Sequence, residues 1–176
     1  SPELIVAPCI GDEPALIARR VPALAELTVV DFEARWVMDA EGQLRGKLGA
    51  RGDGVAITAV QADLTVAADR ARLLDAAPSL YGLAVFAGMP ARSEDQLEES
   101  LRTNFVGPIQ LAREAAARMR QAGTRGAIVL VSTMQTSAVF ANSTPYSAPK
   151  AALVHAARVL AKECRGAADI RVNVVS

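Results

Sequence analysis

Residues 126–162 decide the fold: they run Ala127-Ile-Val-Leu-Val131, then a loop rich in serine and threonine, then Tyr146-Ser-Ala-Pro-Lys150. Five consecutive apolar residues, several of them β-branched, predict a strand that is buried on both faces. Pro145 suits the first turn of a helix, and apolar residues then recur with a helical period as far as Cys164. The stretch therefore predicts a strand, a polar loop and a helix in succession.

Tyr146 and Lys150 lie four residues apart, which puts both side chains on one face of the helix and within reach of each other. An ammonium group beside a phenol favours the phenolate, so we expect Tyr146 to exchange a proton nearer to neutral pH. Many helices carry this spacing as a solvated pair, so the surroundings have to support it. Thr133 does so, because this hydroxyl residue stands at the tip of the predicted strand, thirteen positions before Tyr146.

A strand, a hydroxyl residue, a loop and Tyr-x-x-x-Lys in this order resemble the catalytic segment of the short-chain dehydrogenase/reductase (SDR) family. The resemblance implies that Tyr146 is the general acid for a carbonyl oxygen, or the base for an alcohol in the reverse direction. It also implies that Lys150 supports the ionised phenol and binds the nicotinamide ribose. Thr133 stands where the family usually has serine, and Ser132 and Ser137 are substitutes if Thr133 points away. Alternatively, these hydroxyls cap backbone groups of the loop.

Further positions resemble the family's site. Asn104, in Thr103-Asn-Phe-Val-Gly107, matches the asparagine of the family's proton relay and also suits a kink in the helix. Asp31 follows the second predicted strand and matches the acidic residue that takes the adenosine ribose hydroxyls, which favours NAD over NADP. Asp63, followed by Leu64, resembles the adenine contact, and Gly88 follows the fourth strand at the same edge. Either aspartate could instead cap the following helix.

The cofactor loop is where the sequence departs from the family. The family has Gly-x-x-x-Gly-x-Gly after the first strand, whereas this chain reads Ala7-Pro-Cys-Ile-Gly11-Asp-Glu13, so only Gly11 remains. Backbone N–H groups have to approach the pyrophosphate closely at a helix N-terminus, and Asp12 and Glu13 bring carboxylates to that place. We therefore expect weak or absent dinucleotide binding. Phe86 also replaces the second asparagine that the family has before Ala87-Gly88.

Strands and helices alternate along the chain, which predicts an α/β fold of the Rossmann type: a doubly wound parallel sheet of six strands with helices on both faces, in a single domain over residues 1–176. The predicted strands are 4–7, 26–30, 55–60, 83–86, 127–131 and 170–175. The predicted helices are 12–24, 66–77, 94–120 with a kink at Gly107-Pro108, and the one that begins near Tyr146. Residues 32–54 contain five glycines and predict a broken helix and loop.

The composition agrees with one globular domain, since 51% of the 176 residues are apolar and 22% are charged. The 19 acidic and 19 basic residues cancel, so no overall field favours nucleic acid or an anionic membrane. We expect neither a membrane span nor a signal peptide, and a cytoplasmic location. Cys9 and Cys164 are expected to be buried free thiols, and no residues have the spacing of metal ligands.

Two functions are open at this point. The first is an oxidoreductase that transfers a hydride between a nicotinamide cofactor, preferably NAD, and an alcohol or ketone, using Tyr146, Lys150, Thr133 and Asn104. The alternative is a catalytically silent subunit that has lost dinucleotide binding and is the structural partner of an active paralogue. The sequence ends at Ser176, before the family's Pro-Gly, substrate-covering region and seventh strand, so we expect an incomplete substrate pocket.

The partners expected are a small-molecule alcohol or ketone, and neither nucleic acid nor membrane. The helices over residues 94–120 and 146–164 are expected to form a homo- or hetero-oligomer interface. Small side chains permit close approach of helices, and those expected at the interface are Ala112, Ala116, Ala156 and Ala157.

Overall fold

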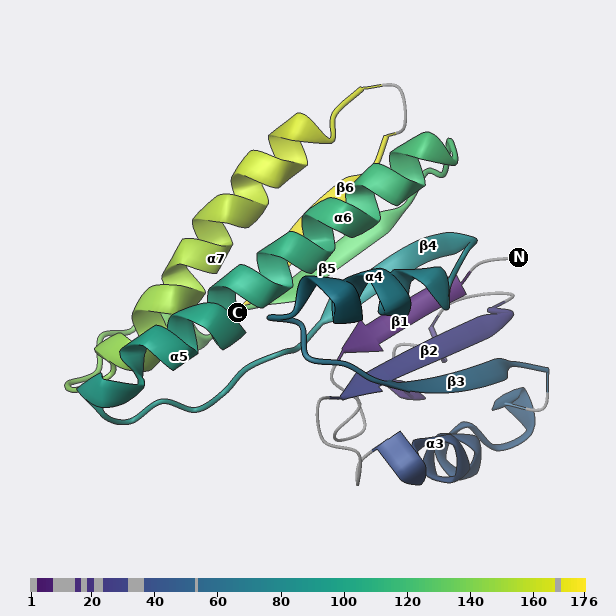
Figure 1. Cartoon of the computed structure of the whole chain (residues 1–176), viewed down its shortest axis with the longest axis horizontal. Helices are drawn as coiled ribbons and strands as arrows, with labels where there is room; N and C mark the ends of the chain where they lie inside the picture. Colours follow the sequence, from purple (N-terminus) through teal and green to yellow (C-terminus); the bar gives the residue numbers. More distant parts are fainter. Residues whose placement is uncertain are drawn as a thin grey trace.

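The computed structural model describes residues 3–7, 15–16, 19–20, 24–31, 37–52, 54–166 and 169–176. The described strands are β1 (Glu3–Ala7), β2 (Glu26–Asp31), β3 (Ala56–Gln61), β4 (Leu80–Val85), β5 (Ala127–Val131) and β6 (Arg171–Val175). They form one sheet in the order β3-β2-β1-β4-β5-β6, and every neighbouring pair is parallel (Figure 1). The predicted Rossmann-type sheet of six parallel strands is confirmed.

β1 and β4 are neighbours in the middle of the sheet. From β1 the chain continues through β2 and β3 to one edge, and from β4 it continues through β5 and β6 to the other edge, so the strand order reverses between β1 and β4. Ligands of doubly wound sheets bind at such a switch point, beyond the carboxyl ends of the strands. β4 begins three residues earlier than predicted, at Leu80, because Leu80 is buried and pairs with Glu3 at the start of β1. The functional residues should therefore be sought where β1, β4 and β5 end.

The longer helices are α3 (Ala40–Leu48), α4 (Ala67–Asp75), α5 (Leu97–Leu101), α6 (Gly107–Gln121) and α7 (Thr144–Glu163). Short 3-10 turns cover η1 (Gly49–Gly52), η2 (Glu94–Gln96) and η4 (Met134–Thr136). Of the helix predicted over residues 12–24, Ala15 and Leu16 are helical, and residues 12–14, 17–18 and 21–23 lie outside the described residues. In the glycine-rich stretch, α3 and η1 form the predicted broken helix.

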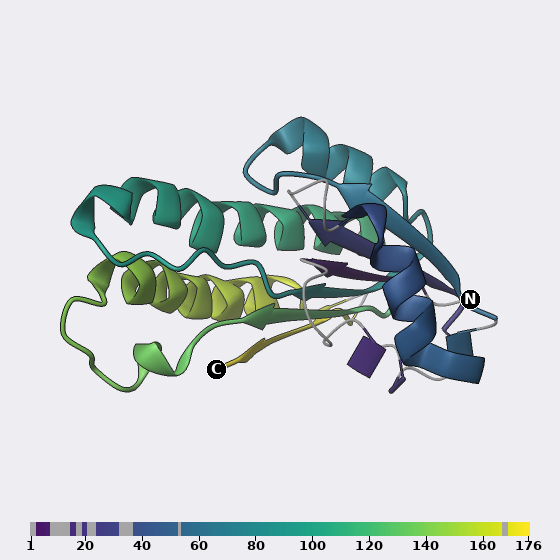
Figure 2. The ribbon, with the colours of Figure 1, turned by 90° about the horizontal axis from the view of Figure 1, so that it is seen from below.

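Two apolar cores lie on the two faces of the sheet. Alternate strand residues point to opposite faces, so Ile5 belongs to one core and its neighbours Leu4 and Val6 belong to the other. Helices α4, α6 and α7 cover the first core, and α3 covers the second, on the other side of the sheet (Figure 2). Among the described residues, the second face is covered over β1, β2 and β3 but not over β6, whose residues Arg171, Asn173 and Val175 are exposed.

The long helix predicted over residues 94–120 is present, but it is not α-helical throughout. A π-helical turn, η3 (Arg102–Val106), lies between α5 and α6. A π-helical turn inserts an extra residue into the helix and often marks a functional position. The interruption was predicted at Gly107-Pro108, and it lies immediately before that pair, at the turn that contains Asn104. Figure 1 shows α5, α6 and α7 side by side.

Two further expectations are settled by burial. Ala112, Ala116 and Ala157 are at most 2% exposed and pack in the chain's own first core, so these three alanines cannot contact a partner. The prediction of an interface through these three is wrong, because their small side chains bring α6 and α7 close to the sheet. Ala156 is only partly buried against that core, and an interface through other residues of the two helices stays a prediction. Cys164 is a buried free thiol as predicted, and Cys9 lies outside the described residues. No described helix is long and apolar enough to cross a membrane.

Candidate active site

Among the described residues, Lys150 is the largest side chain that is fully buried, at 2% exposure. Its ammonium group donates hydrogen bonds to the backbone carbonyls of Ala87, at 2.9 Å, and Val131, at 3.0 Å. Ala87 follows β4 and Val131 is the last residue of β5, so the cation lies at the carboxyl ends of two neighbouring strands. Burial lowers the pKa of Lys150 from 10.5 to about 8. A cation held this way, at the edge where ligands bind, is typical of a functional site.

Tyr146 lies one helical turn before Lys150, in the first turns of α7, and is half-buried. Pro145 occupies the first turn as predicted, where its missing N–H would have had no partner in any case. The hydrogen bonds described for the Lys150 ammonium go to backbone carbonyls rather than to the Tyr146 phenol. The helix therefore presents both residues at the same end of the sheet, and the expected proton exchange at Tyr146 stays a prediction.

The hydroxyls after β5 divide between two roles. Thr133 is half-buried and caps η4, where its Oγ1 accepts a hydrogen bond from the Gln135 backbone N–H at 3.4 Å. Ser132 is buried, and its hydroxyl donates to the Lys150 backbone carbonyl at 3.2 Å. Ser132 thus ties α7 to the end of β5, while Ser137 is exposed in the loop. Thr133 stays the candidate for contact with substrate, although its hydroxyl also performs the alternative capping role.

Asn104 is fully buried in the π-helical turn, and its amide holds the segment that follows β4. Its Oδ1 accepts from the Met89 N–H at 2.6 Å, and its Nδ2 donates to the Met89 carbonyl at 2.9 Å and to Ser100 Oγ at 2.6 Å. A side chain at Gly88 would place its Cβ 3.3 Å from the Lys150 ammonium and 3.5 Å from Asn104 Oδ1. The structure thus brings Asn104, Gly88 and Lys150 together.

The residues predicted at the adenosine end lie around the ends of β2 and β3. Asp31 is the last residue of β2 and is 2% exposed. Asp63 accepts a hydrogen bond from the Thr65 N–H at 2.8 Å, and its own N–H donates to Asp69, so it shapes the turn before α4. Leu64 packs against the first core and its carbonyl accepts from Arg70. Asp63 thus closes a turn before the helix, but it does not cap α4, whose N-cap is Val66 and receives no hydrogen bond from a side chain. The contact of Asp63 with adenine stays a prediction.

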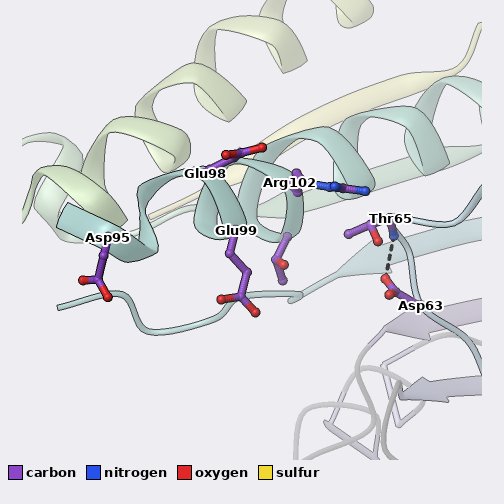
Figure 3. A pocket seen from close by; sticks show the side chains of 7 residues that line it. Asp63, Thr65, Asp95, Glu98, Glu99 and Arg102 are labelled. Carbon is purple, nitrogen blue, oxygen red and sulfur yellow. Dashed lines mark hydrogen bonds between the residues drawn. The ribbon is translucent and has the colours of Figure 1, made fainter. Parts of the chain in front are cut away.

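A groove of about 430 Å³ opens beside Asp63 (Figure 3). Figure 3 shows the Arg102 side chain directed toward Thr65 and Asp63, while Asp95, Glu98 and Glu99 lie along the helical segment that forms the other wall. The residues that line the groove are Asp63, Thr65, Asp95, Glu98, Glu99, Arg102 and Thr103. The groove does not include Tyr146, Lys150 or Thr133, so it is separate from the proposed reaction centre.

Gly11, Asp12 and Glu13 lie outside the described residues, so the structure does not bear on the expected weak binding of the pyrophosphate. Phe86 is described: it is partly buried and packs against the second core. Where the family has an amide, this chain thus has an aromatic ring that contributes to packing. Among the described residues, no group of three or more acidic, histidine or cysteine side chains could hold a metal ion.

Sequence reasoning missed Ser100 and the two carbonyls that bind Lys150. The carbonyls of Ala87 and Val131 leave no trace in residue type, because every residue carries one. Ser100 could have been found, since it precedes Asn104 by four residues and side chains at that spacing meet on a helix.

Comparison with known proteins supports the same family. A family model described as short chain dehydrogenase matches residues 30–176. The chloroplastic NADPH-dependent aldehyde reductase 2 of Arabidopsis thaliana is 38% identical over 84 residues, which make up 48% of this chain and 30% of that protein. The alignment thus spans less than a third of this relative.

Solved structures share the fold. A short-chain type dehydrogenase/reductase from Mycobacterium ulcerans is 26% identical, with a TM-score of 0.84 over 98% of this chain and 65% of that one. A short chain dehydrogenase from Mycobacterium smegmatis is 20% identical, with a TM-score of 0.84 over 100% and 75%. A xylitol dehydrogenase with bound NAD⁺ is 19% identical, with a TM-score of 0.83 over 100% and 69%.

Proposed function

Because the chain belongs to the short-chain dehydrogenase family, we propose that it transfers a hydride between a nicotinamide dinucleotide and an alcohol or ketone. One observation carries this proposal: a buried lysine on the helix of Tyr146 has its ammonium group at the carboxyl ends of β4 and β5. A buried cation lowers the stability of the folded protein. A role in the reaction explains why this chain nevertheless buries one.

The roles follow from the chemistry of each group. Tyr146 donates a proton to the carbonyl oxygen during reduction and accepts one from the alcohol during oxidation. The Lys150 ammonium stabilises the phenolate that forms and offers a donor to the hydroxyls of the nicotinamide ribose. Thr133 orients the substrate oxygen with its hydroxyl. The dinucleotide, when bound, supplies or takes the hydride.

The described residues fit a nicotinamide ribose beside Lys150. Gly88 leaves free the space that a side chain would take next to the ammonium group and Asn104. Lysine has three N–H donors, and two of them are described as bonded to carbonyls. The third N–H of Lys150 could donate to a ribose hydroxyl, and the space beside Gly88 could admit the ribose.

NAD is the proposed cofactor in preference to NADP. Asp31 ends β2 at the edge where the adenosine ribose is expected, and a carboxylate there accepts both hydroxyls and repels a 2′-phosphate. At 2% exposure, this carboxylate has to be uncovered before it can act on a ligand. The Arabidopsis relative is named for NADPH, so the preference needs its own test.

The second candidate function is a silent subunit that serves as the structural partner of an active paralogue. Two observations favour it: Asp31 is buried, and Phe86 packs into the core in place of a polar residue. A silent subunit would keep the fold and lack turnover, so one set of assays separates the two candidates.

The test is turnover of an aldehyde, ketone and alcohol panel with NAD(H) and NADP(H), in the unmodified protein and in Tyr146→Phe. We expect measurable turnover in the former and a loss of roughly 100-fold or more in the latter, as removal of a general acid–base produces. Tyr81→Phe is the matched control, since Tyr81 is the other tyrosine of the chain. Turnover that Tyr146→Phe leaves unchanged would remove Tyr146 from the mechanism, and no turnover at all would favour the silent subunit.

A further inference from the structure

Ser100 and Asn104 form a buried polar pair beside the proposed reaction centre. Both side chains are 0% exposed, and they lie four residues apart, so they meet on one face of the helical segment. Asn104 Nδ2 donates to Ser100 Oγ at 2.6 Å. Ser100 is the penultimate residue of α5, and Asn104 lies in the π-helical turn that follows.

The Asn104 amide uses both of its N–H donors and its oxygen in hydrogen bonds. An asparagine amide has two N–H donors, and here one goes to the Met89 carbonyl and the other to Ser100. Its oxygen accepts from the Met89 N–H. Without the Ser100 hydroxyl, one donor would lose its acceptor at a fully buried position, which is costly enough to turn the amide or open its contacts.

Met89 directly follows Ala87 and Gly88, the two residues that lie against the Lys150 ammonium group. Ala87 accepts from the ammonium group at 2.9 Å, and the position of a Gly88 Cβ is 3.3 Å from that group and 3.5 Å from Asn104 Oδ1. We propose that Ser100 is a positioning residue: through Asn104, it holds the backbone of Gly88 and Met89 against the Lys150 ammonium. The consequence for turnover rests on the proposed function, whereas the consequence for the backbone does not.

Amide hydrogen exchange tests the backbone part, because the Met89 N–H donates to the amide that Ser100 holds. In Ser100→Ala, we expect exchange at Met89 to accelerate roughly tenfold relative to the Leu83 amide in β4, since one buried acceptor is lost. Ser93→Ala is the matched control: it removes a helix cap of comparable energy in the same helical segment, but Ser93 bonds Gln96 and no site residue. Exchange should then be unchanged at Met89. If Ser100→Ala does not fold, Ser100→Cys weakens the acceptor and permits the same comparison.

Kinetics test the catalytic part. Ser100→Ala should lower kcat roughly tenfold and leave the KM of the dinucleotide within about twofold, because misplaced reacting groups slow chemistry more than binding. Adding Ser100→Ala to Asn104→Ala should cause no further loss, since Ser100 acts through Asn104. Equal acceleration at Met89 and Leu83, or additive losses in the double variant, would overturn the proposal. Absence of turnover in the unmodified protein would instead overturn the proposed function, and the exchange result would still decide the positioning role.

Discussion

At the scale of residues, Lys150 is the most informative side chain. An ammonium group loses its hydration when it is buried, and the carbonyls of Ala87 and Val131 restore only part of that energy. The pKa of Lys150 is accordingly lowered to about 8. A residue that costs the folded state stability and lies at the ends of two strands is better explained by a reaction than by packing.

The lowered pKa predicts a pH dependence of stability. Between about 8 and 10.5 the unfolded chain retains a proton that the folded protein has lost, so the free energy of unfolding rises with pH in this window. The total rise from Lys150 should be about 3 kcal/mol. The free energy of unfolding is measured by denaturant for the unmodified protein and for Lys150→Met, from neutral pH to pH 10.5. The difference between the two proteins isolates the contribution of Lys150. A difference that stays constant with pH would show that Lys150 titrates normally.

Cofactor preference is the second prediction at this scale. If the Asp31 carboxylate repels a 2′-phosphate, Asp31→Asn should raise the affinity for NADPH and lower the affinity for NADH. The ratio of the NADPH affinity to the NADH affinity should rise roughly tenfold. Fluorescence titration with both dinucleotides measures the change. Tighter binding of NADPH than NADH by the unmodified protein would show that Asp31 does not select the cofactor.

The sequence indicated Lys150 through its spacing from Tyr146, and Asn104 through the resemblance of its segment to the family, and the structure places both against Gly88. It could not indicate what binds them. Lys150 reaches carbonyls 63 and 19 residues away in the chain, and such contacts depend on how β4 and β5 are placed by the fold. The second role of Thr133, as a cap of η4, is local and was open as an alternative from the start.

At the scale of elements, the strands were predictable because the strands of a covered parallel sheet are runs of mostly apolar residues. The run 127–131 was expected to be buried on both faces, but in β5 buried residues alternate with partly exposed ones, so one of its faces is only partly covered. The π-helical turn was not predictable, since its extra residue depends on how the helical segment packs rather than on its own residue types. Gly107 shows the packing: a Cβ at this position would lie 3.0 Å from the backbone of Leu64. The helix approaches the end of β3 this closely only because residue 107 has no side chain.

Gly107→Ala should therefore destabilise the protein, by about 1–3 kcal/mol, since backbone atoms have to move to admit the methyl group. Gly46→Ala is the matched control, because Gly46 is helical and a Cβ there would meet nothing within 4 Å. That variant should gain up to about 1 kcal/mol from helix propensity. Denaturant unfolding of both variants gives the comparison, and equal stabilities would show that the segment moves freely away from Leu64.

At the scale of the whole molecule, the alternation of strands and helices was enough to predict the parallel sheet, whereas the family was identified from the segment that contains Thr133, Tyr146 and Lys150. The alternation did not reveal which helix faces are free. The exposed apolar side chains of the long helices are Leu101, Val106 and Val159 rather than the alanines expected from helix packing. An oligomer through α5, α6 and α7 thus stays a proposal, with these three residues as its contacts.

Light scattering tests this proposal. The unmodified protein should form a dimer or larger assembly at micromolar concentration, and Leu101→Arg with Val159→Arg should be monomeric, because two charges would be buried in the interface. Val66→Arg is the control, since Val66 is also exposed but precedes α4. A monomeric unmodified protein would contradict the interface.

Calorimetric titration of NADH into the unmodified protein and into Lys150→Met tests most directly whether the buried cation marks a dinucleotide site. We predict saturable binding in the micromolar range or weaker, because the sequence leads us to expect the carboxylates of Asp12 and Glu13 where the pyrophosphate would bind. Lys150→Met should weaken binding by roughly tenfold or more, through loss of a charged donor. If neither NADH nor NADPH binds to the unmodified protein at millimolar concentration, or if Lys150→Met binds equally well, Lys150 does not hold a nicotinamide ribose.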